Sequence, residues 1–237
     1  MEEHVMKLLA IESSSLVAGV AIWEDDLITA EYTLNHKITH SQTLLPMVDE
    51  ICRMTETEPE SFDAIAVAAG PGSFTGLRIG VATAKGLGFA LGIPMVAVPT
   101  LEAMACNLYG CGHLICPIMD ARREQTYTGI YRYEGEQLVT VRKQDAIAIS
   151  ELIAILNDLG EEVDFVGDGI PVFREALDAG LKVGHRYAPA GLNRQRAASV
   201  AVLGAERLKK GQTVSAEELL PDYLRVSQAE REREARL

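Results

Sequence analysis

The fold is decided by residues 68–94, which read AAGPGSFTGLRIGVATAKGLGFALGIP. They complete the short, wholly apolar run AIAVAAG, which ends at Gly70 and is typical of a strand at the centre of a sheet. A glycine and proline turn follows, and residues 75–91 have the pattern of a helix rich in glycine. The rest of the chain repeats this alternation of strand and helix, which predicts an α/β fold.

A phosphate group is one explanation for the glycines. A glycine loop between a strand and a helix presents free N–H groups and the positive end of the helix dipole. The P-loop pattern, however, needs Gly-Lys-Ser/Thr where this chain has Thr75-Gly76-Leu77, and the pattern G-x-G-x-x-G is also absent. The loop alone is therefore weak evidence for a nucleotide.

Close packing is the other explanation. Gly76, Gly80, Ala84, Gly88 and Gly92 recur every four positions, so they share one face of the helix. A glycine inside a helix costs up to ~1 kcal/mol relative to alanine, which implies a compensating close approach of another element. The pattern leaves two such elements open: another layer of the same domain, or a second protein molecule.

The surrounding segments predict two similar halves, each with hairpin strands first and alternating helices and strands afterwards. The strands are expected at 8–11, 17–23, 27–34, 64–70, 94–100, within 112–141, and at 163–166; the helices are expected at 41–54, 75–91, 148–160 and 194–211. We place Pro46 in the first turn of its helix and assign Ser150 as a helix cap.

Two α/β domains with a cleft between them follow from this order of elements. We expect an N-terminal domain at residues 1–105 and a C-terminal domain at residues 106–237. The late helix, at about residues 195–211, is free to pack back on the first domain.

Composition narrows the class of protein. The chain has 22 Lys and Arg against 34 Asp and Glu, which gives a formal charge of −12. This negative charge argues against a protein that binds nucleic acid by itself, because phosphate binding needs a basic face. No apolar run approaches the ~20 residues of a membrane helix. The acidic, polar start at Met1 and the reduced state expected of the cysteines predict a cytoplasmic protein.

Two groups of metal-binding residue types occur, and neither predicts a metal site. The run CNLYGCGHLIC holds Cys106, Cys111, Cys116 and His113, but it lacks a paired Cys-x(2–4)-Cys knuckle, which favours buried thiols. The run HKITH, residues 36–40, holds a histidine at each end but lacks the glutamate of H-E-x-x-H, which favours surface or capping roles.

Six segments together resemble the bacterial TsaB family, also called YeaZ. They are LLAIESSSLVAGVAI, HSQTLLPMVDEI, GPGSFTGLRIGVATAKGLG, VPTLEAMA, MDARREQTYTGIY and PDYLR, in order from about Lys7 to Glu230. The resemblance implies a two-domain actin-like ATPase fold of the ASKHA, ribonuclease H-like type. It also implies a role in forming threonylcarbamoyladenosine beside the anticodon of tRNA.

In that family the catalyst is a paralogue, TsaD, and TsaB is a non-catalytic subunit joined by the ATPase TsaE. The resemblance therefore implies a homodimer when the chain is alone, contact with tRNA through the complex, and no membrane. We expect no cofactor bound by this chain alone, with ATP possible in the complex. The alternative is a free-standing ATPase or small-molecule kinase of the same superfamily.

The catalytic paralogue carries a metal-binding His-x-x-x-His pair, and the strand before VPTLEAMA aligns those positions with Thr100 and Met104. Neither residue replaces an imidazole ligand. This loss argues against metal-assisted transfer and equally against a peptidase of the M22-like type.

Two sets of candidate site residues follow. The contact surface is predicted on helices 41–56 and 75–91, with these interface residues: Leu44, Val48, Ile51, Gly76, Leu77, Gly80, Ala84, Leu87 and Gly88. The candidate nucleotide-binding residues are Glu12, Ser13, Ser14, Gly167 and Gly169, although tight turns are the favoured explanation, because turn chemistry alone selects these residues. In DARREQ, the arginines are expected to pair with neighbouring carboxylates.

Overall fold

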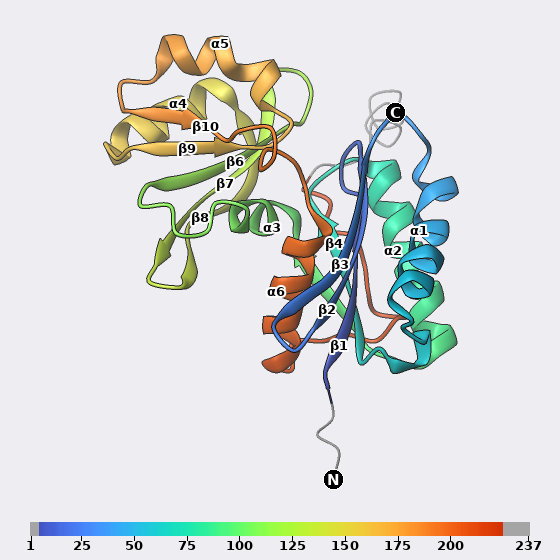
Figure 1. Ribbon diagram of the computed structural model, residues 1–237. Coiled ribbons are helices and arrows are strands. Elements are labelled where there is room, and N and C mark those ends of the chain that lie inside the picture. Colours follow the sequence, from blue (N-terminus) through green and yellow to red (C-terminus); the bar gives the residue numbers. More distant parts are fainter. Residues whose placement is uncertain (1–4, 225–237) are drawn as a thin grey trace.

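Two five-stranded sheets organise the computed structural model, which describes residues 5–224 (Figure 1). The first has the order β3-β2-β1-β4-β5 and the second β10-β9-β6-β7-β8. The strands are β1 (Lys7–Glu12), β2 (Val17–Glu24), β3 (Leu27–Asn35), β4 (Ala64–Gly70), β5 (Met95–Pro99), β6 (Leu114–Asp120), β7 (Gln125–Glu134), β8 (Gln137–Ala148), β9 (Val163–Val166) and β10 (His185–Tyr187).

The two sheets have the same pattern of strand pairing. In the first, β1 pairs antiparallel with β2 and parallel with β4; in the second, β6 pairs antiparallel with β7 and parallel with β9. The repeat predicted from the order of elements is therefore present. All residues of β4 are buried, as its apolar sequence predicted.

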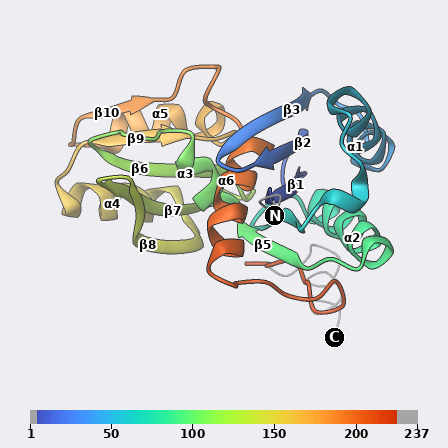
Figure 2. The same cartoon turned by 60° about the horizontal axis from the view of Figure 1, so that its bottom comes forward.

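Helices cover both faces of the first sheet. The helices are α1 (His40–Thr55), α2 (Phe74–Leu91), α3 (Thr100–Cys106), α4 (Ile149–Leu159), α5 (Ile170–Gly180) and α6 (Ala197–Lys209), with a short 3₁₀ turn at Pro59–Ser61. Helices α1 and α2 pack on one face of the first sheet and α6 on the other, so that α6 lies between the two sheets in Figure 2. Helices α4 and α5 cover the second sheet.

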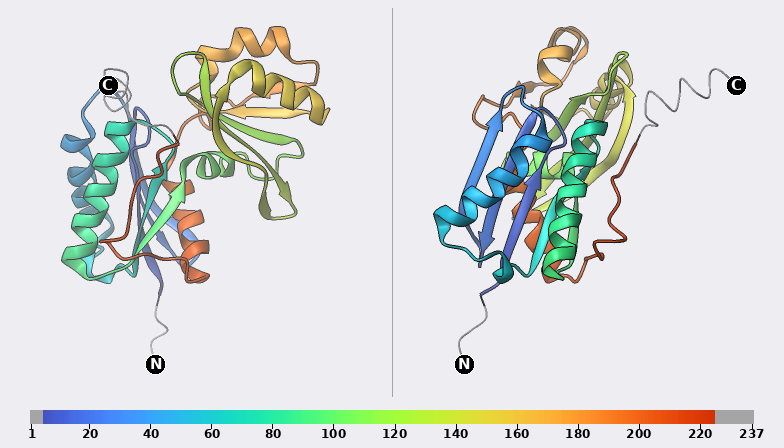
Figure 3. Two further views of the ribbon diagram at one scale, coloured as in Figure 1. Left: turned by 180° about the vertical axis from the view of Figure 1, so that it is seen from behind. Right: turned by 90° about the vertical axis from the view of Figure 1, so that its right-hand side faces the viewer.

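The segment after α6 returns along the first sheet. Val214 bridges to Met95 at the edge of β5, and the chain then passes α2, as Figure 3 shows. Near its end, the Asp222 backbone N–H donates to the Ala69 carbonyl at 2.7 Å. The last described residues therefore reach the loop between β4 and α2.

Two local predictions were wrong. Pro46 lies in the second turn of α1 rather than the first, at an exposed position where water can replace the lost backbone hydrogen bond. Ser150 does not cap α4, because the helix leaves β8 directly after Ala148. The Ile149 N–H donates instead to the Glu124 carbonyl at 3.1 Å, which satisfies one of the free N–H groups at the start of the helix.

The glycine ridge packs inward. A Cβ at Gly76 would collide with the Ser13 carbonyl oxygen, one at Gly80 would collide with Ser13 Oγ, and one at Gly88 would lie 2.6 Å from the Met95 side chain. Another layer of the same domain is thus the element that the glycines approach. This overturns the expectation that the ridge faces a second molecule.

The predicted interface residues as a set also pack within the chain. Eight of the nine are buried within the chain itself: Leu44, Val48, Ile51, Gly76, Leu77, Gly80, Ala84 and Gly88. The ninth, Leu87, is half-buried and packs against the same core. Apolar side chains at helical spacing mark the face that covers the sheet, and the sequence does not distinguish that face from one that meets a partner.

A pair of substitutions in α2 tests this inward packing. Gly76→Ala is expected to destabilise the chain by about 1–3 kcal/mol, because the new methyl group meets backbone atoms that cannot move aside. Gly86→Ala, in the same helix, is the control: among the described residues no atom lies within 4 Å of its Cβ position, so stability should rise by up to ~1 kcal/mol. Urea unfolding measures both, and equal stability of the two variants would contradict the packing.

Candidate cleft and contact face

A cleft of about 560 Å³ lies between the two sheets. The β1–β2 turn, the loop after β4 and the start of α2 line it from the first sheet. The end of β6, the β9–α5 turn and the segment after α6 complete it. This is where the sequence analysis expected a nucleotide.

The β1–β2 turn is closed on itself. Ser14 donates from its backbone N–H and its hydroxyl to Glu12 Oε1, at 2.6 and 2.5 Å, and Ser13 Oγ donates to the Gly76 carbonyl at 2.9 Å. All three turn residues are buried. Ser14 alone among the five candidate nucleotide residues lines the cleft within the described chain.

Glu12 is the unusual group of this turn. Its Oε2 is buried and has no hydrogen-bond partner among residues 5–224. Burial raises the pKa of Glu12 to about 7, against the lowering effect of the Ser14 hydrogen bonds, and the nearby Asp168 carboxyl raises the pKa further. The side chain is therefore largely protonated in mildly acidic solution.

Gly167 and Gly169 lie opposite, in the β9–α5 turn. Gly167 has φ +122°, and a Cβ there would collide with the Ile118 carbonyl oxygen; one at Gly169 would lie 2.9 Å from the same oxygen. The two glycines thus have a packing reason in the chain itself. Nucleotide binding by these turns stays a prediction.

Carboxylates outnumber basic side chains in the lining of the cleft. Asp120, Asp168 and Asp222 all line it, and burial raises the pKa of Asp168. Arg122 also lines it but pairs with Asp120 at 3.1 Å, which confirms the expected pairing for this one of the two arginines. A phosphate entering here would meet more negative than positive charge.

Sequence reasoning missed an aromatic and arginine cluster at the cleft. The rings of Phe74 and Tyr223 lie 4.7 Å apart, and the Arg78 guanidinium lies 3.9 Å above the Phe74 ring. Arg78 Nε also donates to the Tyr223 hydroxyl at 3.1 Å. The segments GPGSFTGLR and PDYLR therefore meet in space, although neither one alone carries a signal for the contact.

The positions aligned with the catalytic histidines lie in α3. Thr100 is 0% exposed and Met104 is 1% exposed, and both side chains belong to the interior. Three further residues of the sequence motifs belong to no group of metal-binding side chains in the described part of the chain. His36 is exposed, His40 bonds through Nε2 to the Ser15 carbonyl at 2.8 Å, and the buried Cys116 contacts Thr128 Oγ1 at 3.3 Å.

A second stripe of small residues lies on the outer face of α2. Ala82, Gly86 and Ala90 are four apart and exposed, and Phe89 beside them is an exposed aromatic residue. On α1, Leu45 is an exposed large apolar residue. We call these five residues the outer face of α1 and α2.

The buried Glu12 carboxyl makes a prediction about pH. Its pKa of about 7 in the folded chain lies above the ordinary value of 4.5, so the folded state holds a proton that the unfolded state releases between these two pH values. Stability should therefore fall as pH rises through this window, by up to ~3 kcal/mol from this group.

Glu12→Gln removes that titration. Relative to the wild-type chain, the variant should gain stability between pH 5 and pH 8 in urea unfolding. A stability difference that stays constant across this range would contradict the protonated state of Glu12.

Comparison with known proteins identifies relatives of this chain. Residues 28–233 match the family model described as TsaD, tRNA N6-adenosine threonylcarbamoyltransferase. The chain is 34% identical over 225 residues to the tRNA threonylcarbamoyladenosine biosynthesis protein TsaB of Bacillus subtilis, covering 95% of this chain and 96% of that one. To TsaB of Escherichia coli it is 30% identical over 227 residues, covering 93% and 95%.

Solved structures agree with these relatives. YeaZ from Pseudomonas aeruginosa superposes with a TM-score of 0.78 at 27% identity, covering 92% of this chain and 99% of that one. ROK hexokinase from Thermus thermophilus shares the fold alone, with a TM-score of 0.50 at 11% identity and coverage of 87% and 100%. The actin-like α/β fold is confirmed. The chain belongs to the TsaB (YeaZ) family of tRNA threonylcarbamoyladenosine biosynthesis proteins.

Proposed function

We propose that this chain is a non-catalytic subunit for threonylcarbamoyl transfer to the adenosine beside the anticodon, and that it binds a TsaD-type catalytic paralogue. Its relatives are named as biosynthesis proteins of this modification, and its sequence matches the model of the catalytic family. Homology to the catalyst without the catalyst's ligands is what a supporting paralogue would have.

The ligand positions support the non-catalytic role. Thr100 and Met104 replace the aligned imidazoles, and both are buried in α3 instead of facing the cleft. A thioether is a poor ligand for a hard cation, and a threonine hydroxyl is a weak neutral donor. Metal-assisted transfer therefore has no imidazole pair at these two positions to support it.

Gly86 is the observation that carries the proposed contact. It lies in the middle of α2, where glycine is unfavourable by up to ~1 kcal/mol relative to alanine. Its Cβ position meets no atom within 4 Å among the described residues, unlike those of Gly76, Gly80 and Gly88. Nothing inside the described chain compensates for this glycine, and close approach by another protein would do so.

The neighbours of Gly86 suit such an approach. Phe89 is 64% exposed on the same helix, and Leu45 is 55% exposed on α1, which packs beside α2, so each of the two helices exposes a large apolar side chain. The small residues would let a partner helix come near, and the apolar side chains would supply buried area at the rim of that contact. The buried ridge beneath fixes α2 on its sheet and so holds this face in place.

The same face serves both forms of the proposed assembly. Alone, the chain would pair with a second copy through α1 and α2; with the catalytic paralogue, the same residues would form the heterodimer. A TsaE-type ATPase joins the complex, and ATP is bound there rather than by this acidic cleft alone. Most of the contact with tRNA falls to the partners, because this chain has a formal charge of −12.

Gly86→Arg separates association from folding. The side chain should leave stability unchanged or slightly raised, because arginine is a better helix former than glycine and the site is open. Association with the TsaD-type partner, measured by calorimetry, should weaken at least ~10-fold, since a long charged side chain fills the close contact. tRNA modification by the reconstituted proteins should fall in parallel.

Ala154→Arg is the matched control. Ala154 is an exposed alanine in α4, on the second sheet, and its substitution adds the same charge. It should leave association and modification unchanged. If Gly86→Arg also pairs normally, the outer face of α1 and α2 is not the contact.

Reconstitution tests the role itself. The catalytic partner and the ATPase should modify tRNA with this chain present and lose most activity without it. Turnover of ATP by the purified chain alone, in the presence of magnesium, would support the alternative, a free-standing ATPase or small-molecule kinase.

A further inference from the structure

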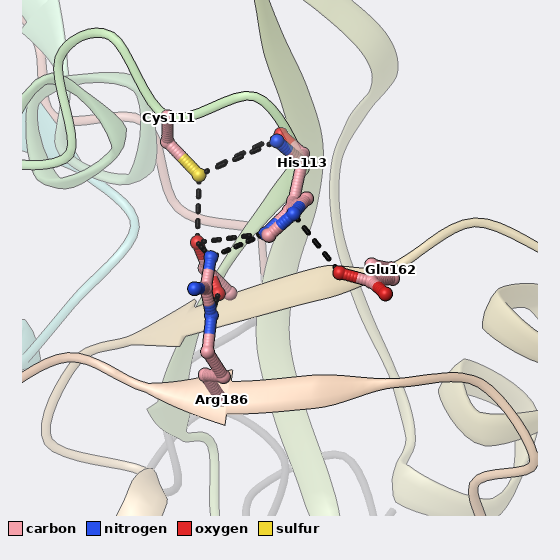
Figure 4. Close-up of polar contacts among 5 residues, drawn as sticks. Cys111, His113, Glu162 and Arg186 are labelled. Carbon is pink, nitrogen blue, oxygen red and sulfur yellow. Dashed lines mark hydrogen bonds and ion pairs between the residues drawn. The ribbon is translucent and has the colours of Figure 1, made fainter.

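Cys111, His113 and Asp164 come together beside the second sheet (Figure 4), and none of the three lines the cleft. Cys111 and His113 lie in the loop that leads into β6, and Asp164 lies on β9. One ligand atom from each residue lies within 4.8 Å of the other two. Cys111 Sγ is 2.6 Å from Asp164 Oδ2, and His113 Nδ1 is 3.4 Å from the same oxygen.

We propose that these three side chains bind a divalent transition metal of the zinc type, through Cys111 Sγ, His113 Nδ1 and Asp164 Oδ2. A thiolate and an imidazole favour zinc over magnesium or calcium, which prefer oxygen ligands. Ligand atoms around a tetrahedral zinc lie roughly 3.3–3.7 Å apart, given bond lengths of about 2.0–2.3 Å. Small side-chain movements therefore bring this set to the required spacing.

Glu162 supplies the outer contact that metal-binding histidines usually have. Its Oε2 lies 2.9 Å from His113 Nε2, on the side of the ring away from Cys111 and Asp164 (Figure 4). A proton held on Nε2 by this carboxylate leaves the Nδ1 lone pair directed at the other two ligands. The arrangement selects the ring tautomer that a metal requires.

The Arg186 guanidinium places a positive charge beside Asp164 and His113, two of the proposed metal ligands. It donates from Nε to Asp164 Oδ1 at 2.8 Å and from a terminal nitrogen to Oδ2 at 2.9 Å, and the same nitrogen contacts His113 Nδ1. The side chain is 64% exposed on the edge strand β10, so the terminal nitrogen can turn into solvent. Nε can keep its bond to Oδ1, which leaves Oδ2 for the metal.

Metal binding then exchanges the thiol proton and the Arg186 contacts for bonds to the metal. The Cys111 thiol gives its proton to the buffer, and the terminal nitrogen of Arg186 leaves Asp164 Oδ2 and His113 Nδ1. The metal forms bonds to Sγ, Nδ1 and Oδ2, and water completes its coordination. Two negative ligands neutralise a divalent ion, and the ion joins the loop before β6 to β9.

The test uses the full, untagged chain, reduced and freed of metal by a chelator. Titration with zinc should show one-to-one uptake, and cobalt should give the thiolate-to-metal charge-transfer absorption that only a sulfur ligand produces. Cys111→Ser should abolish this absorption, and His113→Ala should weaken zinc binding at least ~10-fold. Cys106→Ser, which alters a thiol outside the cluster, should retain both signals.

Two further variants distinguish a built site from chance affinity. Glu162→Gln should weaken zinc binding about 10–100-fold while leaving the sulfur absorption in place at saturation. Arg186→Gln should strengthen binding, because it removes the competing positive charge. A wild-type chain that takes up no zinc, or one whose cobalt spectrum is unchanged by Cys111→Ser, would overturn the proposal.

Discussion

The structure depends on the close contact between the start of α2 and the β1–β2 turn. Gly76 and Gly80 let the helix backbone touch Ser13, and the Ser13 hydroxyl donates to the Gly76 carbonyl at 2.9 Å. The Ser73 N–H donates to the Ser14 carbonyl at 2.6 Å. A larger side chain at either glycine would push the helix off its sheet, so these contacts fix the position of α2.

This contact has consequences on both sides of the helix. Toward the cleft, it packs α2 against the buried β1–β2 turn, in which Ser14 donates to the Glu12 carboxyl. Toward solvent, it holds α2 so that Gly86 and Phe89 face outward beside α1. One packing constraint thus fixes the buried β1–β2 turn on one side of α2 and the exposed Gly86 and Phe89 on the other.

Sequence reasoning succeeded where a pattern is local and failed where direction or distance matters. Nine of the ten described strands and the helices α1, α2, α4 and α6 were predicted, because their apolar residues recur with a clear period. Helix α3 (Thr100–Cys106) and strand β10 (His185–Tyr187) were missed because they are too short to show a period. Helix α5 (Ile170–Gly180) was missed as well, although its buried residues have helical spacing. The ridge was assigned to the wrong surface, because spacing identifies a stripe but not what it faces. The cluster of Cys111, His113 and Asp164 joins residues that only the sheet pairing brings together.

Hydrogen–deuterium exchange of the chain, alone and with the TsaD-type partner, tests the central claim most directly. We expect the exposed backbone around Gly86 and Leu45 to gain protection in the complex, while the β1–β2 turn, already sealed by α2, changes little. Protection confined to the second sheet, with α1 and α2 exchanging as in the free chain, would contradict this account.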